Sequence, residues 1–244
     1  MLQSSQASEL EIIQSGEISV AARILPFAVY LSFLALAEII MWGSTGEEHG
    51  WVDHVDLWLY PLKIAAVLGL LLYFWPHYSE LKCRIIRDRQ EGILAITVGV
   101  LVYAAWVRMD WSWAMQGDTP GDGYDPFQVG TGAGVILAIV RIFGASVVVP
   151  VMEELFWRSF LIRYLISSKF ESVAIGTFSA FSFVTTVVLF GLEHDLWLAG
   201  MMAGVAYTAL LYYTKRLWPC ILAHAVTNFA LGIHVLATGQ WRWW

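Results

Sequence analysis

The sequence predicts an all-α bundle of seven or eight membrane-spanning helices that encloses a polar cavity, and three observations support this fold class. Of the 244 residues, 58% are hydrophobic and 14% are charged, which is too apolar for an ordinary soluble domain. The hydrophobic residues gather in repeated runs near the roughly 20 residues that a bilayer core requires. These runs lack the alternating pattern of a membrane β-barrel, so helices must satisfy the backbone hydrogen bonds.

Seven apolar runs give the expected helices in order. They cover residues 24–42, 58–75, 92–107, 131–152, 172–192, 196–214 and 219–237. The second and third runs are short, and the amphipathic stretch 155–166 either extends the fourth helix or bends away from it. The runs leave no stretch long enough for a separate soluble core. We therefore expect a single membrane domain over residues 1–244 that begins with a polar N-terminal segment, residues 1–20.

Charges in the connections predict the orientation of the bundle. Basic residues follow the second, fourth and sixth runs, whereas the alternate connections are acidic. Because basic connections favour the cytoplasm, we expect a multi-pass protein of the cell inner membrane with a cytoplasmic N-terminus. The basic residues are Lys82, Arg84, Arg87, Arg89, Arg163, Lys169, Lys215 and Arg216, and the acidic residues are Glu47, Glu48, Asp53, Asp56, Asp110, Asp118, Asp122 and Asp125.

Charge and cysteine usage exclude two further classes of protein. The net charge of −6 provides no basic surface of the kind that nucleic acid requires. The apolar runs make the lipid bilayer the expected partner instead. Cys83 and Cys220 have neither the spacing of a redox pair nor the number needed for a zinc cluster or a disulfide framework. Packing is their expected role.

Two adjacent glutamates and an arginine end the fourth apolar run. Ionisable side chains at membrane depth cost about 2.5–3.5 kcal/mol each on insertion scales, so they persist where they pair or perform chemistry. Glu154 and Arg158 are four positions apart and can pair on one helix face. Glu153 is offset by about 100° around the helix, where an apolar shell suits a general base. The alternative is a cluster that snorkels at a helix end.

Two histidines and an asparagine add polar groups to other apolar segments. His194 follows an uncharged run, and His224 and Asn228 are four positions apart on the last run, so these two share one helix face. Each histidine on its own could be a packing residue. Imidazole and carboxamide groups can also donate hydrogen bonds to a developing oxyanion. One polar site shared by the three segments explains all of these residues.

Three short motifs, in order and on separate segments, combine these residues. They read Glu153-Glu154-xxx-Arg158, Phe190-xxx-His194 and His224-xxx-Asn228. Together they resemble the signature motifs of the CAAX prenyl endopeptidase and bacteriocin-processing family, the type II CAAX protease or Abi group. The resemblance covers roughly residues 149–232, which would form the motif-bearing catalytic core. The chain is also similar to the CAAX protease-related branch associated with exosortases, which implies a link to an exosortase sorting system.

The resemblance implies an intramembrane glutamate-type endopeptidase. Such a hydrolase would cleave a peptide bond of a membrane-associated protein or peptide without a metal or other cofactor. The chemistry agrees with the residues, which offer a base, a partner that orients water and donors for the oxyanion. The implied roles are base for Glu153, water orientation for His194, support for Glu154 and Arg158, and oxyanion binding for His224 and Asn228.

Several alternatives remain open at this stage. Glu153, His194 and His224 could ligate zinc, although no HExxH pair is present. The polar cluster could also belong to a non-catalytic membrane scaffold, to an immunity protein, or to a proton-coupled transporter. Outside the motifs, Glu38 and Arg141 could pair across the bundle.

Strict alternation of seven spans creates a conflict within this interpretation. It places Glu153 and His224 toward the cytoplasm but His194 toward the opposite side, too far away to share one water. The motifs therefore require a broken, re-entrant or tilted segment around a cavity that opens to the cytoplasm. Pro150 and Gly191 are plausible positions for such irregularity, which membrane proteins tolerate around polar cavities.

Overall fold

Every regular element of the described residues is a helix. The computed structural model describes residues 2–43, 54–116 and 123–244, and it confirms the all-α class. The expected acidic loop residues Glu47, Glu48, Asp53, Asp118 and Asp122 lie outside the described residues. The α-helices are α1 Leu2–Gly43, α2 Val55–Tyr73, α3 Arg89–Trp106, α4 Thr131–Phe143, α5 Val149–Glu154, α6 Ile162–Tyr164, α7 Ala180–Leu192, α8 Trp197–Thr214 and α9 Trp218–Thr238.

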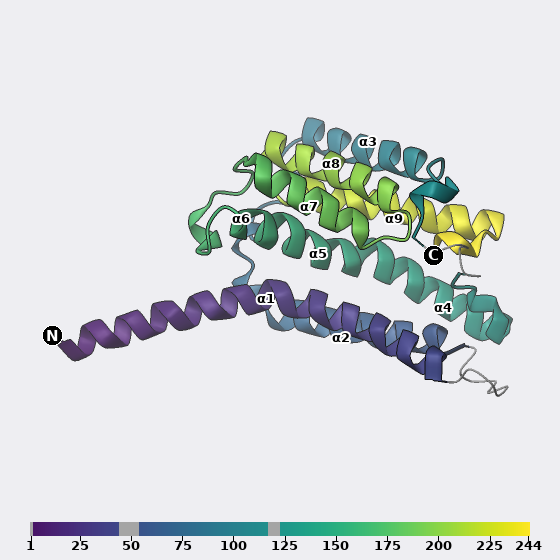
Figure 1. Ribbon diagram of the computed structural model, residues 1–244, viewed down its shortest axis with the longest axis horizontal. Helices are drawn as coiled ribbons and strands as arrows, with labels where there is room; N and C mark the ends of the chain where they lie inside the picture. The colour runs from purple at the N-terminus through teal and green to yellow at the C-terminus, as the bar shows by residue number, and fades with distance from the viewer. Residues whose placement is uncertain (1, 44–53, 117–122) are drawn as a thin grey trace.

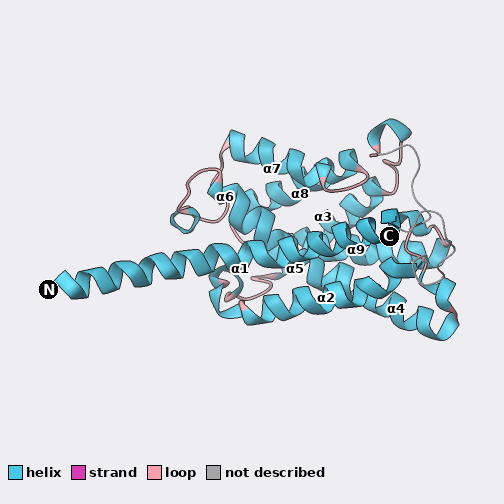
Figure 2. Cartoon of the chain, turned by 60° about the horizontal axis from the view of Figure 1, so that its bottom comes forward, coloured by secondary structure: helices cyan, strands magenta, loops and turns pink. Residues whose placement is uncertain are grey.

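The helices form two groups on either side of a central run. Figure 1 shows α1 and α2 side by side along one side of the bundle and α3, α7, α8 and α9 along the other. The run from α4 to α6 lies between them and contacts both groups. The N-terminal part of α1 extends beyond the bundle (Figures 1 and 2). Segments far apart in sequence therefore meet along the central run.

The central run is one helical segment with two wide turns. Between α4 and α5 lies the π-helical segment η6, Gly144–Val148, and between α5 and α6 lies a second, η7, Leu155–Leu161. Stretch 155–166 thus extends the fourth helix, the first of the two expected alternatives. Pro150 lies just after η6 and has no N–H to donate, so the regular ladder is interrupted near it. The two wide turns flank Glu153 and Glu154.

Four segments are long and apolar enough to cross a membrane. They are Gly16–Trp42, Val55–Tyr73, Thr131–Tyr164 and Trp218–Thr238. Large apolar side chains lie exposed on the outer faces, among them Leu72, Leu101, Ile136 and Phe181, which fits contact with lipid. These features fit a multi-pass membrane protein. The count of seven or eight spans and the inner-membrane orientation stay predictions.

A buried ion cluster fastens α1 to the central run. Arg23 donates to both carboxylate oxygens of Glu80, over 2.9 Å to Oε1 and 2.7 Å to Oε2, and the two side chains are 1% and 4% exposed. Ser159 also donates to Glu80. Arg163, expected in a connecting loop, is instead buried in α6 with its Nη2 4.0 Å from Glu80. The cluster lies beside the basic connections, at what we call the basic end of the bundle.

The charges of this cluster set the ionisation of Glu80. Burial opposes the charged form, but the hydrogen bond and the positive charge of Arg23 outweigh it and hold the pKa of Glu80 below its usual range. The folded-state pKa therefore lies below that of the unfolded chain. The resulting stabilisation is fully present above the unfolded value of about 4.3 and is lost as the pH falls through the folded value.

Replacement of Glu80 by glutamine should destabilise the fold in a pH-dependent way. Loss of one partner of a buried ion pair leaves Arg23 uncompensated, at a cost of about 3–5 kcal/mol. Thermal unfolding in detergent micelles should show a lower Tm for Glu80→Gln at pH 7, with the difference from the parent shrinking below about pH 4. Asp110→Asn is the matched control, because its pair with Arg242 is 36% and 43% exposed and should contribute little. An unchanged Tm for Glu80→Gln would contradict this account.

Candidate active site

A short helical hairpin brings His194 to the paired glutamates. Helix α7 has 13 residues and so spans about 20 Å, less than a hydrocarbon core of about 30 Å. Helices α7 and α8 pack closely where they meet at Gly191 and Gly200. A Cβ added to Gly200 would lie only 3.0 Å from the Cα of Gly191, so a larger residue would not fit without a shift. The chain reverses direction at this point, and His194 lies in the turn. Strict alternation of full spans was therefore wrong for His194.

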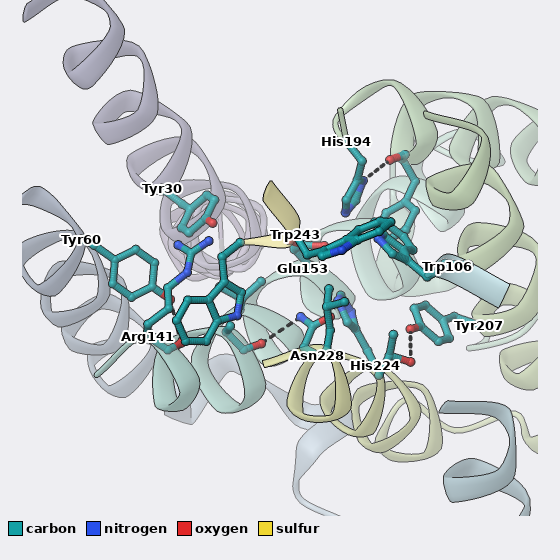
Figure 3. Close-up of a pocket in the computed structure, with 17 residues that line it drawn as sticks. Tyr30, Tyr60, Trp106, Arg141, Glu153, His194, Tyr207, His224, Asn228 and Trp243 are labelled. Atoms are coloured by element: carbon teal, nitrogen blue, oxygen red, sulfur yellow. Dashed lines mark hydrogen bonds between the residues drawn. The ribbon is translucent and has the colours of Figure 1, made fainter. Parts of the chain in front are cut away.

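A cavity of about 180 Å³ lies where the three motifs meet. Its lining includes Glu153 from α5, His194 from the hairpin turn, and His224 and Asn228 from α9. Figure 3 shows these four side chains gathered around the same space. The volume leaves room for several water molecules. One polar cavity thus joins residues from three distant segments.

Glu154 ties two of the motifs together from behind the cavity. The Glu154 side chain is 0% exposed, and its Oε1 accepts from Arg158 Nη1 at 3.2 Å and from His224 Nδ1 at 3.0 Å. The expected pair of Glu154 and Arg158 is therefore present. The bond to His224 was not expected, because no local spacing relates residues on different helices. It holds the imidazole ring and places the proton of that bond on Nδ1.

His194 is oriented by its own helix. Its Nδ1 donates to the carbonyl oxygen of Phe190 at 2.7 Å, and its ring packs between Phe190, at 4.8 Å, and Trp106, at 5.3 Å between centroids. A neutral imidazole that donates from Nδ1 has an accepting Nε2. His194 is half-buried and lines the cavity, so Nε2 is suited to accept a hydrogen bond from water.

Glu153 differs from Glu154 in having no ionic partner among the described residues. Its side chain is buried, it lines the cavity, and its Oε2 has no hydrogen-bond partner in the described part of the chain. A buried carboxylate oxygen without a protein partner requires water or a ligand. Glu154 Oε2 is also buried without a partner there, but Glu154 does not line the cavity and its Oε1 is bonded to two side chains. The two adjacent glutamates therefore divide into one held by the protein and one that faces the cavity.

Asn228 is fixed to the wide turn η6. Its Nδ2 donates to the carbonyl oxygen of Ala145 at 2.9 Å. A carboxamide carries two N–H donors, so the second donor remains for a ligand in the cavity. The irregular turn thus positions the Asn228 amide group, for which the sequence predicted a role in oxyanion binding.

Two side chains that the sequence did not single out support His224. The ring of Tyr207 stacks on the His224 ring with 5.1 Å between centroids and 20° between planes. The Tyr207 hydroxyl donates to Thr227 Oγ1 at 2.8 Å. The only signal in the sequence is a tyrosine in an apolar run, which does not identify a site. Beside His194, Glu193 accepts a hydrogen bond from Trp157 Nε1 at 3.1 Å.

The cavity continues away from the basic end. Tyr60, Arg141, Trp243 and Trp244 also line it. The expected opening of the cavity toward the cytoplasm stays a prediction. The expected pair of Glu38 and Arg141 is also absent from the ion pairs of the described residues.

The zinc alternative has no preformed ligand set in the described residues. No group of three or more histidine, cysteine, aspartate or glutamate side chains lies close enough together there to hold a metal ion, which includes Glu153, His194 and His224. The Nδ1 atoms of both histidines are already used in hydrogen bonds. Independence from metal stays a prediction.

Comparison with known protein families gives one match. Residues 134–230 match the family model described as Rce1-like, type II CAAX prenyl endopeptidase Rce1-like. No curated protein and no solved structure matches the chain. The matched segment contains all three motifs, so it confirms the resemblance to the CAAX protease family. It does not test the similarity to the exosortase-associated branch.

The ion pair behind the cavity should act as a unit in stability. Arg158→Gln leaves the Glu154 carboxylate buried with only His224 as partner and should cost about 3–5 kcal/mol. The double variant Glu154→Gln with Arg158→Gln should lose less than the sum of the single losses, because each single change leaves an uncompensated charge. Unfolding free energies in detergent measure this coupling. Additive losses would show that the pair contributes no coupling.

Proposed function

Because residues 134–230 match the CAAX protease family model, we propose that the chain is an intramembrane glutamate-type endopeptidase. Its substrate is a membrane-associated protein or peptide, and its reaction is hydrolysis of a peptide bond without a metal. The observation that most supports this proposal is Glu153, a buried carboxylate that lines the same cavity as His194 and has an oxygen without a partner in the described residues.

In the proposed mechanism, Glu153 and His194 activate one water. The water donates one hydrogen to the Glu153 carboxylate and the other to His194 Nε2, and its oxygen attacks the scissile carbonyl carbon. Glu153 takes the first proton and later delivers it to the leaving amine, which balances the hydrolysis. The products are a new carboxylate and a new amine.

The opposite wall of the cavity stabilises the charge that develops on the carbonyl oxygen. Asn228 supplies its free N–H, and His224 supplies Nε2–H when both ring nitrogens are protonated. Glu154 lies behind His224 and holds its ring through the bond to Nδ1. Removal of one donor of this kind typically lowers kcat by about 10²–10³-fold.

The membrane arrangement is part of the proposal. We place α3, α7 and α8 within the bilayer together with the four long apolar segments, and the basic end in the cytoplasm. This gives seven helical segments, the lower of the two numbers expected from the sequence, within the cell inner membrane. A link to an exosortase sorting system would identify the source of the substrate.

Glu153→Gln should abolish proteolysis and leave the protein folded. The glutamine nearly preserves shape but cannot accept a proton from water, so turnover should fall by about 10²–10⁴-fold. His194→Ala should fail similarly. The assay incubates the purified protein in lipid nanodiscs with a membrane protein fraction and identifies new termini by mass spectrometry. Tm measurements confirm that each variant is folded.

Three controls separate this mechanism from its alternatives. Glu171→Gln is a matched glutamate change at the basic end, where Glu171 accepts from Ser19 at 2.5 Å, and it should retain turnover. Strong chelators should leave cleavage unchanged, whereas a zinc enzyme would lose it and regain it with metal. Proton-driven uptake that depends on Glu153 without any cleavage would indicate a transporter, and full turnover of Glu153→Gln would defeat the proposed base.

A further inference from the structure

Two basic side chains contact one tyrosine ring in the part of the bundle that is far from the basic end. The Arg141 guanidinium carbon lies 4.4 Å from the centroid of the Tyr60 ring, and Lys63 Nζ lies 5.0 Å from the same centroid. Lys63 also lies over Tyr30, at 4.2 Å. The Lys63 residue is only 5% exposed. Two positive charges are thus held close together within an apolar bundle.

Neither cation has a carboxylate partner among the described residues. The ion pairs found there involve other side chains, and the Nε of Arg141 is buried without a hydrogen-bond partner in the described part of the chain. Aromatic rings attract a cation but do not accept its N–H bonds as an anion does. Buried charges persist where they are paired or take part in function. Within the part of the chain that the structure describes, no carboxylate pairs with either cation.

This cation pair adjoins the proposed active site. Tyr30, Tyr60 and Arg141 line the same cavity as Glu153 and His194. Figure 3 shows Arg141 beside Tyr30 and Tyr60 on one side of the cavity, with His194 and His224 on the other. Lys63 does not line the cavity, but its Nζ lies over the rings of both tyrosines. An anion in this part of the cavity would belong to the molecule that reaches Glu153.

The spacing limits the length of that molecule. Arg141 and Glu153 lie on one helical run, twelve positions apart in the sequence, which at about 1.5 Å per residue corresponds to roughly 18 Å. An extended peptide covers about 3.3 Å or slightly more per residue. Up to about five residues therefore separate an anion at Arg141 from the bond at Glu153.

We propose that Arg141, assisted by Lys63, binds a carboxylate of the peptide substrate within about five residues of the scissile bond. Arginine suits this role because its planar fork can donate two parallel hydrogen bonds to a carboxylate. The carboxylate belongs either to the chain terminus or to an acidic side chain. The inference rests on the proposed function for its substrate and adds a residue that determines specificity.

Binding to the Glu153→Gln protein tests the site independently of catalysis. Three fluorescein-labelled octapeptide pools of randomised neutral residues are compared in nanodiscs, one with a free C-terminus, one amidated, and one amidated with a single glutamate. We expect the carboxylate pools to bind about 10- to 100-fold more tightly than the neutral amide pool. The better of the two carboxylate pools identifies the source. Equal binding of all three pools overturns the proposal.

Variants assign this preference to Arg141. In the Glu153→Gln background, Arg141→Gln should bring the three pools to equal affinity, Arg141→Lys should retain part of the preference, and Lys63→Gln should weaken it. Arg108→Gln is the matched control, because Arg108 is exposed near the same end of the bundle and should change nothing. If Tm measurements show that Arg141→Gln is unfolded, the binding preferences of Arg141→Lys and Lys63→Gln test the proposal. An undiminished preference in a folded Arg141→Gln, or in both Arg141→Lys and Lys63→Gln, overturns the proposal.

Turnover measured with the unsubstituted protein separates the two proposals. Removal of the preferred carboxylate, whether it is terminal or on the glutamate, should raise KM and leave kcat nearly unchanged, because the carboxylate contributes equally in the ground and transition states. Cleavage of acid and amide pools with equal KM would sustain the protease and overturn the carboxylate site. Carboxylate-selective binding without any cleavage would sustain the site and overturn the protease.

Discussion

The Glu154 carboxylate is the interaction on which the rest of the site depends. It is fully buried and joins Arg158 on the central run to His224 on α9. Arg158 in turn lies over the ring of Phe190, with 4.2 Å between the guanidinium carbon and the centroid, and Phe190 provides the carbonyl that orients His194. A single charge therefore positions parts of all three motifs. It does so from behind the cavity, without lining it.

The adjacent glutamates show how environment separates two identical side chains. Glu154 is neutralised by an arginine and bonded to an imidazole, so it is committed to structure. Glu153 lines the cavity and has a buried oxygen that only water or a ligand can satisfy among the described residues. An offset of about 100° on one helix is enough to create this division. Arg141 and Lys63 are basic side chains that, like Glu153, have no ionic partner among the described residues.

Local features of this chain could be predicted from the sequence, and features that depend on distant contacts could not. The apolar runs identified the helices, and the spacing of Glu154 and Arg158 identified their pair, because both follow from helix geometry. The bond from His224 to Glu154 and the contact of Asn228 with η6 join separate helices, so no spacing predicts them. Simple alternation of spans would separate His194 from Glu153, whereas both line one cavity because His194 lies in the turn after the short helix α7.

The most direct test of the central claim is the origin of the oxygen in the product. In a single turnover in ¹⁸O-water with enzyme in excess, attack by a water that Glu153 activates should place one ¹⁸O atom in the new carboxylate. Mass spectrometry of the released fragment measures it. If Glu153 instead attacked the carbonyl itself, water would label the enzyme carboxylate. An unlabelled first product would therefore contradict the account.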